Sequence, residues 1–124
     1  MTRIYSNLSS DLNKELTRQC KAIGYRRSDV LAYFADNPEF TGKICDEILA
    51  SDELFTYLDE TVGINMYSNT ITIKLNTENS LRTILRKHHI NVSTFLLFII
   101  RENIVISRMK NLLPPDLKLK KYTR

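Results

Sequence analysis

Two stretches of the chain decide the fold that we expect: Gly24-Tyr25-Arg26-Arg27-Ser28-Asp29-Val30 and, 65 residues later, His89-Ile90-Asn91-Val92-Ser93-Thr94-Phe95. An amphipathic run precedes each turn, and a second apolar run follows each Ser. Apolar residues spaced by three and four predict helices on both sides of the turn. The matching positions are Leu16, Cys20, Ile23, Tyr25, Ser28, Val30, Leu31 and Phe34 in the first copy and Leu81, Leu85, His88, Ile90, Ser93, Phe95, Leu96 and Ile99 in the second. This repeat at a fixed offset predicts two related helix-turn-helix units in one chain.

A segment of alternating apolar and polar residues precedes each copy. Residues 2–8 predict a strand with Ile4, Ser6 and Leu8 on one face, and Ser9 or Ser10 caps the next helix. Residues 70–75 predict a strand with Ile71, Ile73 and Leu75 inward, and the next cap is Asn76 or Thr77. The outward positions are Arg3, Tyr5, Asn7, Thr70, Thr72 and Lys74. We therefore expect a mainly α protein with a small antiparallel β-ribbon.

These segments resemble the ribbon-helix-helix superfamily of DNA-binding proteins, the Arc and MetJ type. The step Leu8-Ser9-Ser10-Asp11-Leu12 and the turn at 24–30 fit its pattern, as do the strand at 71–75 and the turn at 89–95, although His89 stands where Gly is usual. Both units in one chain, with the stretch Tyr33 to Phe40, resemble the TraY relaxosome accessory proteins of plasmid conjugation. The resemblance implies two ribbon-helix-helix units that form an intramolecular pseudo-dimer.

The charge distribution supports a division of the chain into four parts. Residues 1–34 carry a formal charge of +3, residues 35–66 carry −7 and residues 67–124 carry +8. We expect a first unit at 1–37, an acidic helical insert at 38–68, a second unit at 69–112 and a basic tail at 113–124. Basic ends suit a polyanion such as DNA, while the acidic insert suits a different partner.

The resemblance implies that a two-stranded ribbon enters the major groove and reads base edges with alternate side chains. The candidate base contacts are Arg3, Tyr5, Asn7, Thr70, Thr72 and Lys74. The alternative interpretation is that these residues form only the solvated face of a half-exposed strand. The start of the second helix in each unit is the candidate phosphate site, with Arg26, Arg27, Ser28, Asn91, Ser93 and Thr94. The alternative there is that the two Ser residues are plain N-caps.

Other chemistry is not indicated. Cys20 and Cys45 form no Cys-x-x-Cys pair and read as buried thiols, and the adjacent His88 and His89 have no ligand at metal-site spacing. We expect no metal, no cofactor and no enzyme activity. The apolar run at 95–100 is too short to cross a membrane and reads as a buried helix. Without a secretion pattern at the N-terminus, the expected location is the cytoplasm.

The expected function is sequence-specific binding of double-stranded DNA, as a relaxosome accessory factor or a transcription regulator. The target DNA is not written in the chain, so both roles stay open, as does oligomerisation along DNA. The alternative is an interaction module with a degenerate ribbon. In that case residues 43–64 dock a relaxase or another protein through the acidic insert and its apolar residues Leu54, Phe55, Tyr57 and Leu58.

Overall fold

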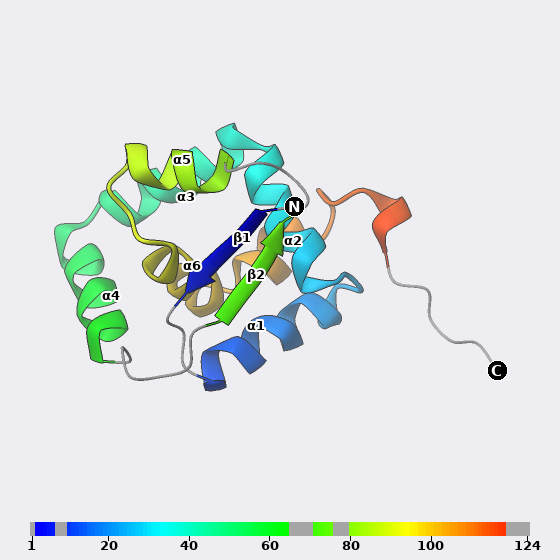
Figure 1. Ribbon diagram of the computed structural model, residues 1–124, viewed down its shortest axis with the longest axis horizontal. Coiled ribbons are helices and arrows are strands. Elements are labelled where there is room, and N and C mark those ends of the chain that lie inside the picture. Colours follow the sequence, from blue (N-terminus) through cyan, green and yellow to red (C-terminus); the bar gives the residue numbers. More distant parts are fainter. Residues whose placement is uncertain (1, 7–9, 65–70, 76–79, 119–124) are drawn as a thin grey trace.

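The described part of the chain is mainly helical, which confirms the mainly α part of the predicted fold class. The computed structural model describes residues 2–6, 10–64, 71–75 and 80–118, with side chains for 11–61 and 81–118 (Figure 1). The elements in chain order are β1 Thr2–Ser6, α1 Ser10–Ala22, α2 Arg27–Asp36, α3 Pro38–Leu49, α4 Asp52–Ile64, β2 Ile71–Leu75, α5 Ser80–Lys87, α6 Val92–Arg101, the π-helical turn η1 Val105–Met109 and the 3-10 turn η2 Pro115–Leu117. No helix in these ranges is long and apolar enough to span a bilayer.

Two short backbone segments from opposite halves of the chain pair with each other. β1 runs antiparallel to β2, with Thr2 opposite Leu75, Ile4 opposite Ile73 and Ser6 opposite Ile71. Figure 1 shows the pair lying across the helices, and β1 contacts α6 while β2 contacts α2. Residues 7–9, 70 and 76–77, where we expected the strand ends and the caps, lie outside the described residues.

The two helix-turn-helix segments repeat in their backbone geometry. α2 and α6 have the same length, and α6 begins and ends 65 residues after α2. The last residue of α5 also lies 65 residues after the last residue of α1. The backbone N–H of Tyr25 donates to the carbonyl of Cys20 at 3.0 Å, and the N–H of Ile90 donates to Leu85 at 2.9 Å. Each turn is therefore closed by the same six-residue hydrogen bond of a Schellman motif.

The residue that ends the first helix lies in the left-handed region in both turns. Gly24 has φ +84° and His89 has φ +56°, and their N–H groups donate to Lys21 and Arg86 at 2.9 and 3.1 Å. Glycine adopts this conformation without a Cβ clash, whereas His pays an energetic penalty. The second turn therefore keeps the geometry of the first although His89 stands where the first has Gly24.

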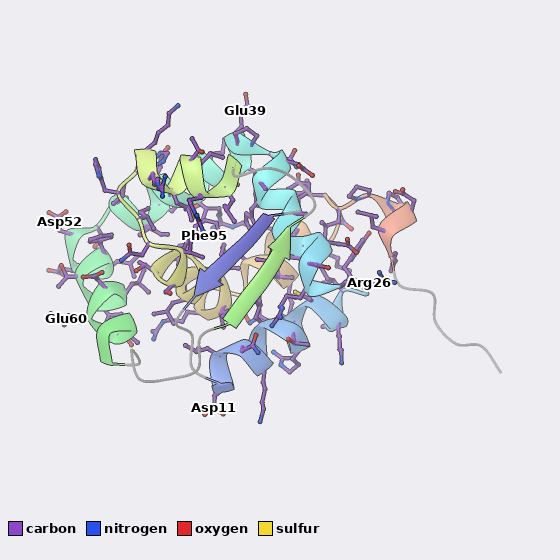
Figure 2. All side chains as sticks on the ribbon, in the orientation of Figure 1. Asp11, Arg26, Glu39, Asp52, Glu60 and Phe95 are labelled. Atoms are coloured by element: carbon purple, nitrogen blue, oxygen red, sulfur yellow. The ribbon has the colours of Figure 1, made fainter. Side chains whose placement is uncertain are left out.

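The core is shared by both halves of the chain. The rings of Phe34 and Phe95 meet edge to face with centroids 5.2 Å apart, and Figure 2 shows Phe95 in the interior among the helices. All residues from 95 to 100 are buried, which confirms the predicted buried helix. Cys20 and Cys45 are free and buried, as predicted, and burial raises the pKa of their thiols to about 12 and about 11.

The acidic insert is part of the same core. Its helices α3 and α4 bury Ile44, Ile48 and Leu58. α3 packs against α5 and α6, and α4 packs against α6. Burial of these side chains ties the insert to the second helix-turn-helix, because each contributes about 1.5–3 kcal/mol of hydrophobic stabilisation. The insert is therefore a fixed part of the fold and not a separate module.

Candidate nucleic-acid interface

The strand pair brings four of the predicted base-contact positions together. Arg3 lies opposite Lys74, and Tyr5 lies opposite Thr72. Positions directly opposite each other in an antiparallel pair share a face, and successive positions alternate between faces. The four positions therefore share one face of the strand pair, and the pair Ile4 and Ile73 belongs to the other. Asn7 and Thr70 lie outside the described residues.

Two arginines stand at the turn between α1 and α2, and the structure gives them different surroundings. Arg26 is the N-cap residue of α2, has extended backbone (φ −73°, ψ 146°) and is exposed. Figure 2 shows it at the outer edge of the turn. Arg27 is half-buried and donates to Asn13 Oδ1 of α1. Arg26 thus presents its charge to solvent, while Arg27 joins the two helices.

The interpretation of Ser28 and Ser93 as N-caps is wrong. The N-cap residues are Arg26 and Asn91, which have nearly the same backbone angles, and neither makes a side-chain capping hydrogen bond. Ser28 and Ser93 are the second residues of their helices. They lie two residues beyond the extended cap position, so the helical backbone has already begun.

The two helix starts differ in which polar groups reach the surface. Ser28 and Asn91 are exposed. Ser93 is 8% exposed and Thr94 is completely buried, with a hydroxyl that has no hydrogen-bond partner among the described atoms. A buried hydroxyl cannot contact a phosphate without a rearrangement of the helix. Ser93 and Thr94 therefore do not belong to the surface on which a phosphate would lie.

Sequence reasoning missed a set of contacts that link basic groups of the second half to the insert. The guanidinium of Arg101 lies 4.6 Å from the ring centre of Tyr57 and donates to its hydroxyl at 2.6 Å. Arg108 makes two hydrogen bonds to the Glu47 carboxylate, one of them 2.7 Å long. The acidic excess of the insert was the signal available in the sequence, but it did not identify the pairs.

These contacts change the charges that the insert leaves exposed. The hydrogen bonds from Arg108 hold the pKa of the Glu47 carboxyl below its usual value. His88 Nε2 lies 3.7 Å from Asp46 Oδ1, and its Nδ1 lies 2.9 Å from the Ile84 carbonyl. The acidic and phenolic groups of the insert thus contact His88 after α5, Arg101 of α6 and Arg108 of η1.

The apolar residues that we expected to dock a partner are mostly occupied by the fold. Leu58 is 1% exposed, and Leu54 and Phe55 pack against the core. Tyr57 is 46% exposed, but Arg101 covers its ring. The surface that α4 presents to solvent is instead acidic, and Figure 2 shows Asp52 and Glu60 at its outer edge. Along α4 the buried Leu58 and the half-buried Leu54 and Phe55 recur at helical spacing among exposed residues, so these apolar side chains lie on the side that packs against the core.

Within the part of the chain whose side chains are described, no cluster of three or more His, Cys, Asp or Glu residues is arranged to hold a metal ion. The site that remains is the strand pair together with α2, which contacts β2 and begins after the exposed Arg26. No protein-family model, no curated protein and no solved structure matches the chain, so the interpretation of this site depends on its own residues.

Proposed function

We propose that this protein binds double-stranded DNA in a sequence-specific manner and that it does so with the strand pair β1–β2. In this proposal the chain is a tandem ribbon-helix-helix protein whose two units form an intramolecular pseudo-dimer. The observation that carries the proposal is the antiparallel register, which sets Arg3 opposite Lys74 on the face that also holds Tyr5 and Thr72. The duplicated turns at Gly24 and His89 support it.

A two-stranded ribbon is narrow enough to enter the major groove of B-DNA. Arg and Lys are the side chains that most often recognise the O6 and N7 acceptors of guanine, and Thr can contact a thymine methyl. The second face of the pair carries four apolar positions, which suit packing on helices, and the polar Thr2 and Ser6; the apolar ones are Ile4, Ile71, Ile73 and Leu75. The strand pair therefore has the composition required of a reading surface on one side and a core surface on the other.

The start of α2 supplies a candidate phosphate contact beside the strands. Backbone N–H groups at a helix N-terminus and the positive end of the helix dipole favour an anion. α2 contacts β2, and its N-cap Arg26 is exposed. At the equivalent place in the second half, Asn91 is uncharged, and Ser93 and Thr94 are buried. We therefore expect the first half to hold its phosphate more strongly, and the preferred site to be an imperfect inverted repeat.

The charge of the acidic insert also supports binding of DNA at the strand pair. Its exposed carboxylates lie on α3 and α4, and Figure 1 shows α4 at the edge of the molecule, away from the strand pair. These negative carboxylates repel the phosphate backbone of DNA, so binding of DNA to the surface of the insert is disfavoured. In this proposal the segregation of charge directs a duplex toward the strands.

The test is an anisotropy or gel-shift titration of the full chain against a pool of genomic fragments at two salt concentrations. We expect retained duplexes at low salt and a steep loss of affinity as salt rises, because phosphate contacts release counterions. Lys43→Ala is the matched control, since it removes an exposed positive charge from the insert. Failure to retain any duplex at low salt, or equal loss of affinity in Lys43→Ala and Arg3→Ala, refutes the proposal.

The biological role within this function is a further proposal, either a relaxosome accessory factor or a transcription regulator. The same strand pair serves both roles. Mapping of the enriched fragments separates them, because a transfer origin and a promoter differ in their location on the replicon. The cytoplasm is the proposed location.

A second candidate function is a protein-interaction module that acts through the insert. The exposed acidic surface of α4, around Asp52, Glu53 and Glu60, favours it. Removal of residues 43–64 would not test this second function, because it would also remove the core residues Ile44 and Leu58. The joint substitution Asp52→Lys and Glu53→Lys is the appropriate perturbation, with partner capture measured while DNA binding is kept as the control.

A further inference from the structure

A groove runs along the outer side of α2, between this helix and the C-terminal segment at 112–117. Its apolar side chains are Ala32, Tyr33, Leu112 and Leu117, and its acidic side chains are Asp29 and Asp36. Leu112 and Leu117 are 47% and 40% exposed, which places them among the few large apolar side chains that the described part of the chain leaves open to solvent. The groove is thus an apolar channel with acidic sides.

The groove continues around the end of α2 onto α3. A second hollow shares Tyr33 and Asp36 with it and adds Glu39 and Phe40, with Lys43 at its far side. The rings of Tyr33 and Phe40 meet edge to face at 5.6 Å, and Figure 2 shows Glu39 projecting outward from the start of α3. The two hollows together are therefore lined by three carboxylates, those of Asp29, Asp36 and Glu39, and by one ammonium group, that of Lys43.

The wall formed by the C-terminal segment is held in place by the first turn. Leu113 is buried, and the hydroxyl of Tyr25 donates to its carbonyl at 3.3 Å. The side chain of Lys118 crosses the turn so closely that a Cβ on Gly24 would lie 3.0 Å from Lys118 Cε. The C-terminal wall of the groove is consequently fixed to the first turn.

The chemistry of the groove matches the end of this same chain. Residues 118–124 read Lys-Leu-Lys-Lys-Tyr-Thr-Arg, with four basic and no acidic residues. Leu119 and Tyr122 are apolar or aromatic and suit the floor, while Lys120 and Lys121 suit the carboxylates. Asp29 is half-buried, and a cation pairs with such a carboxylate more strongly than in open solvent, whereas Asp36 and Glu39 are exposed.

The described end of the chain forms the wall of its own groove and does not occupy it. The wall segment runs along the groove up to Leu117, and Lys118 has extended backbone (φ −63°, ψ 135°). To enter the same groove, the chain would have to reverse direction at once. Residues 118–122 contain no Gly, Pro, Asn or Asp, the residues that tight reversals favour.

We propose that the groove between α2 and residues 112–117 binds the basic C-terminal tail after Lys118, residues 119–124, of a second copy of this chain. Such a contact joins two different surfaces, so each copy still has a free groove or a free tail. A head-to-tail contact that does not close into a ring adds copies in an open row. This proposal goes beyond DNA binding and does not depend on it.

The test is sedimentation velocity of the full chain over a range of protein concentrations, without DNA. We expect the weight-average mass to rise with concentration. Asp36→Lys should weaken this association by about tenfold, because it replaces an attraction with a repulsion. Asp36 is exposed at the last turn of α2, where a cation suits the helix dipole, so the fold is retained. Asp59→Lys, on the exposed surface of α4, is the matched control and should leave the association unchanged.

A charge exchange makes the test specific. The double substitution Lys120→Glu and Lys121→Glu should also abolish the rise in mass with concentration. When Asp36→Lys is added to this double variant, the charges are opposite again and part of the rise in mass should return. A labelled peptide with the sequence of residues 118–124 should bind the full chain and be displaced by added salt. A chain that stays monomeric at every concentration overturns the proposal, as does association that responds to Asp59→Lys and not to Asp36→Lys. Binding of the peptide to duplex DNA but not to the protein overturns it as well.

Discussion

The substitution His89→Gly should stabilise this protein. His89 is exposed and lies at φ +56°, where its hydrogen bond to Arg86 ends α5. An L residue in the left-handed region loses about 1–2 kcal/mol relative to a helical conformation. Glycine avoids this penalty but loses more backbone entropy on folding, by about 0.5–1 kcal/mol. The net gain is therefore about 0.5–1 kcal/mol, which raises the melting temperature of a chain of this size by about 2–4 °C.

The measurement is urea denaturation followed by circular dichroism, with the free energy of unfolding taken from the midpoint and slope. Lys87→Gly is the matched control: it introduces glycine two residues earlier, at an exposed helical position, and should destabilise by about 0.5–1 kcal/mol. Gly24→Ala should destabilise by about 1 kcal/mol, since Gly24 has φ +84° and an added Cβ would crowd Lys118. If His89→Gly is neutral or destabilising, the equivalence of the two turns is refuted.

Three further perturbations examine the strands, the insert and its ion pair. Arg3→Ala should leave the free energy of unfolding nearly unchanged but lose about 1–3 kcal/mol of discrimination at one base pair. The measurement is fluorescence anisotropy with single-base variants of the selected DNA site, and an unaltered sequence preference would show that Arg3 does not read a base. Leu58→Ala should cost about 2–5 kcal/mol of stability, because it leaves a cavity in the shared core; a loss below about 1 kcal/mol in urea denaturation would mean that the insert is not integral. Arg108→Met should cost less than about 1 kcal/mol at neutral pH, since the pair with Glu47 is partly exposed. The folded-state pKa of Glu47 is lowered, so this contribution is present above about pH 4.5 and is lost as the pH falls through the lowered value; a difference between wild type and Arg108→Met that does not shrink in acid would contradict this assignment.

The two halves of the chain share a backbone design but not a surface. The turns at Gly24 and His89 close with equivalent hydrogen bonds. The residues that follow them differ, with exposed Arg26 in one half and exposed Asn91 in the other. The C-terminal segment covers the first turn through Tyr25 and Lys118, whereas the insert lies beside the second through His88 and Asp46. Local geometry repeats because the same hydrogen bonds are available to any sequence, while charge is set residue by residue.

The sequence by itself determined the helical elements and their repeat. Apolar spacing around Leu16, Cys20 and Val30, and again around Leu81, Leu85 and Phe95, requires one buried stripe on each helix, and the structure buries these residues. This information is local, because a helix brings residues three and four apart onto one face. The run at 95–100, apolar all round, required burial on every side for the same reason.

Only the tertiary structure decided what each polar or ambiguous residue contacts. Nothing in the local sequence shows that Thr94 is buried, that Arg27 donates to Asn13, or that Arg101 covers Tyr57. The opposition of Arg3 and Lys74 also belongs to this class, because the register joins residues that lie 71 positions apart in the sequence. These contacts depend on how helices that are distant in sequence pack together. The neighbours of a residue along the chain do not specify that packing. The apolar spacing therefore predicted the helices, whereas the contacts between the helices became known only from the packed core.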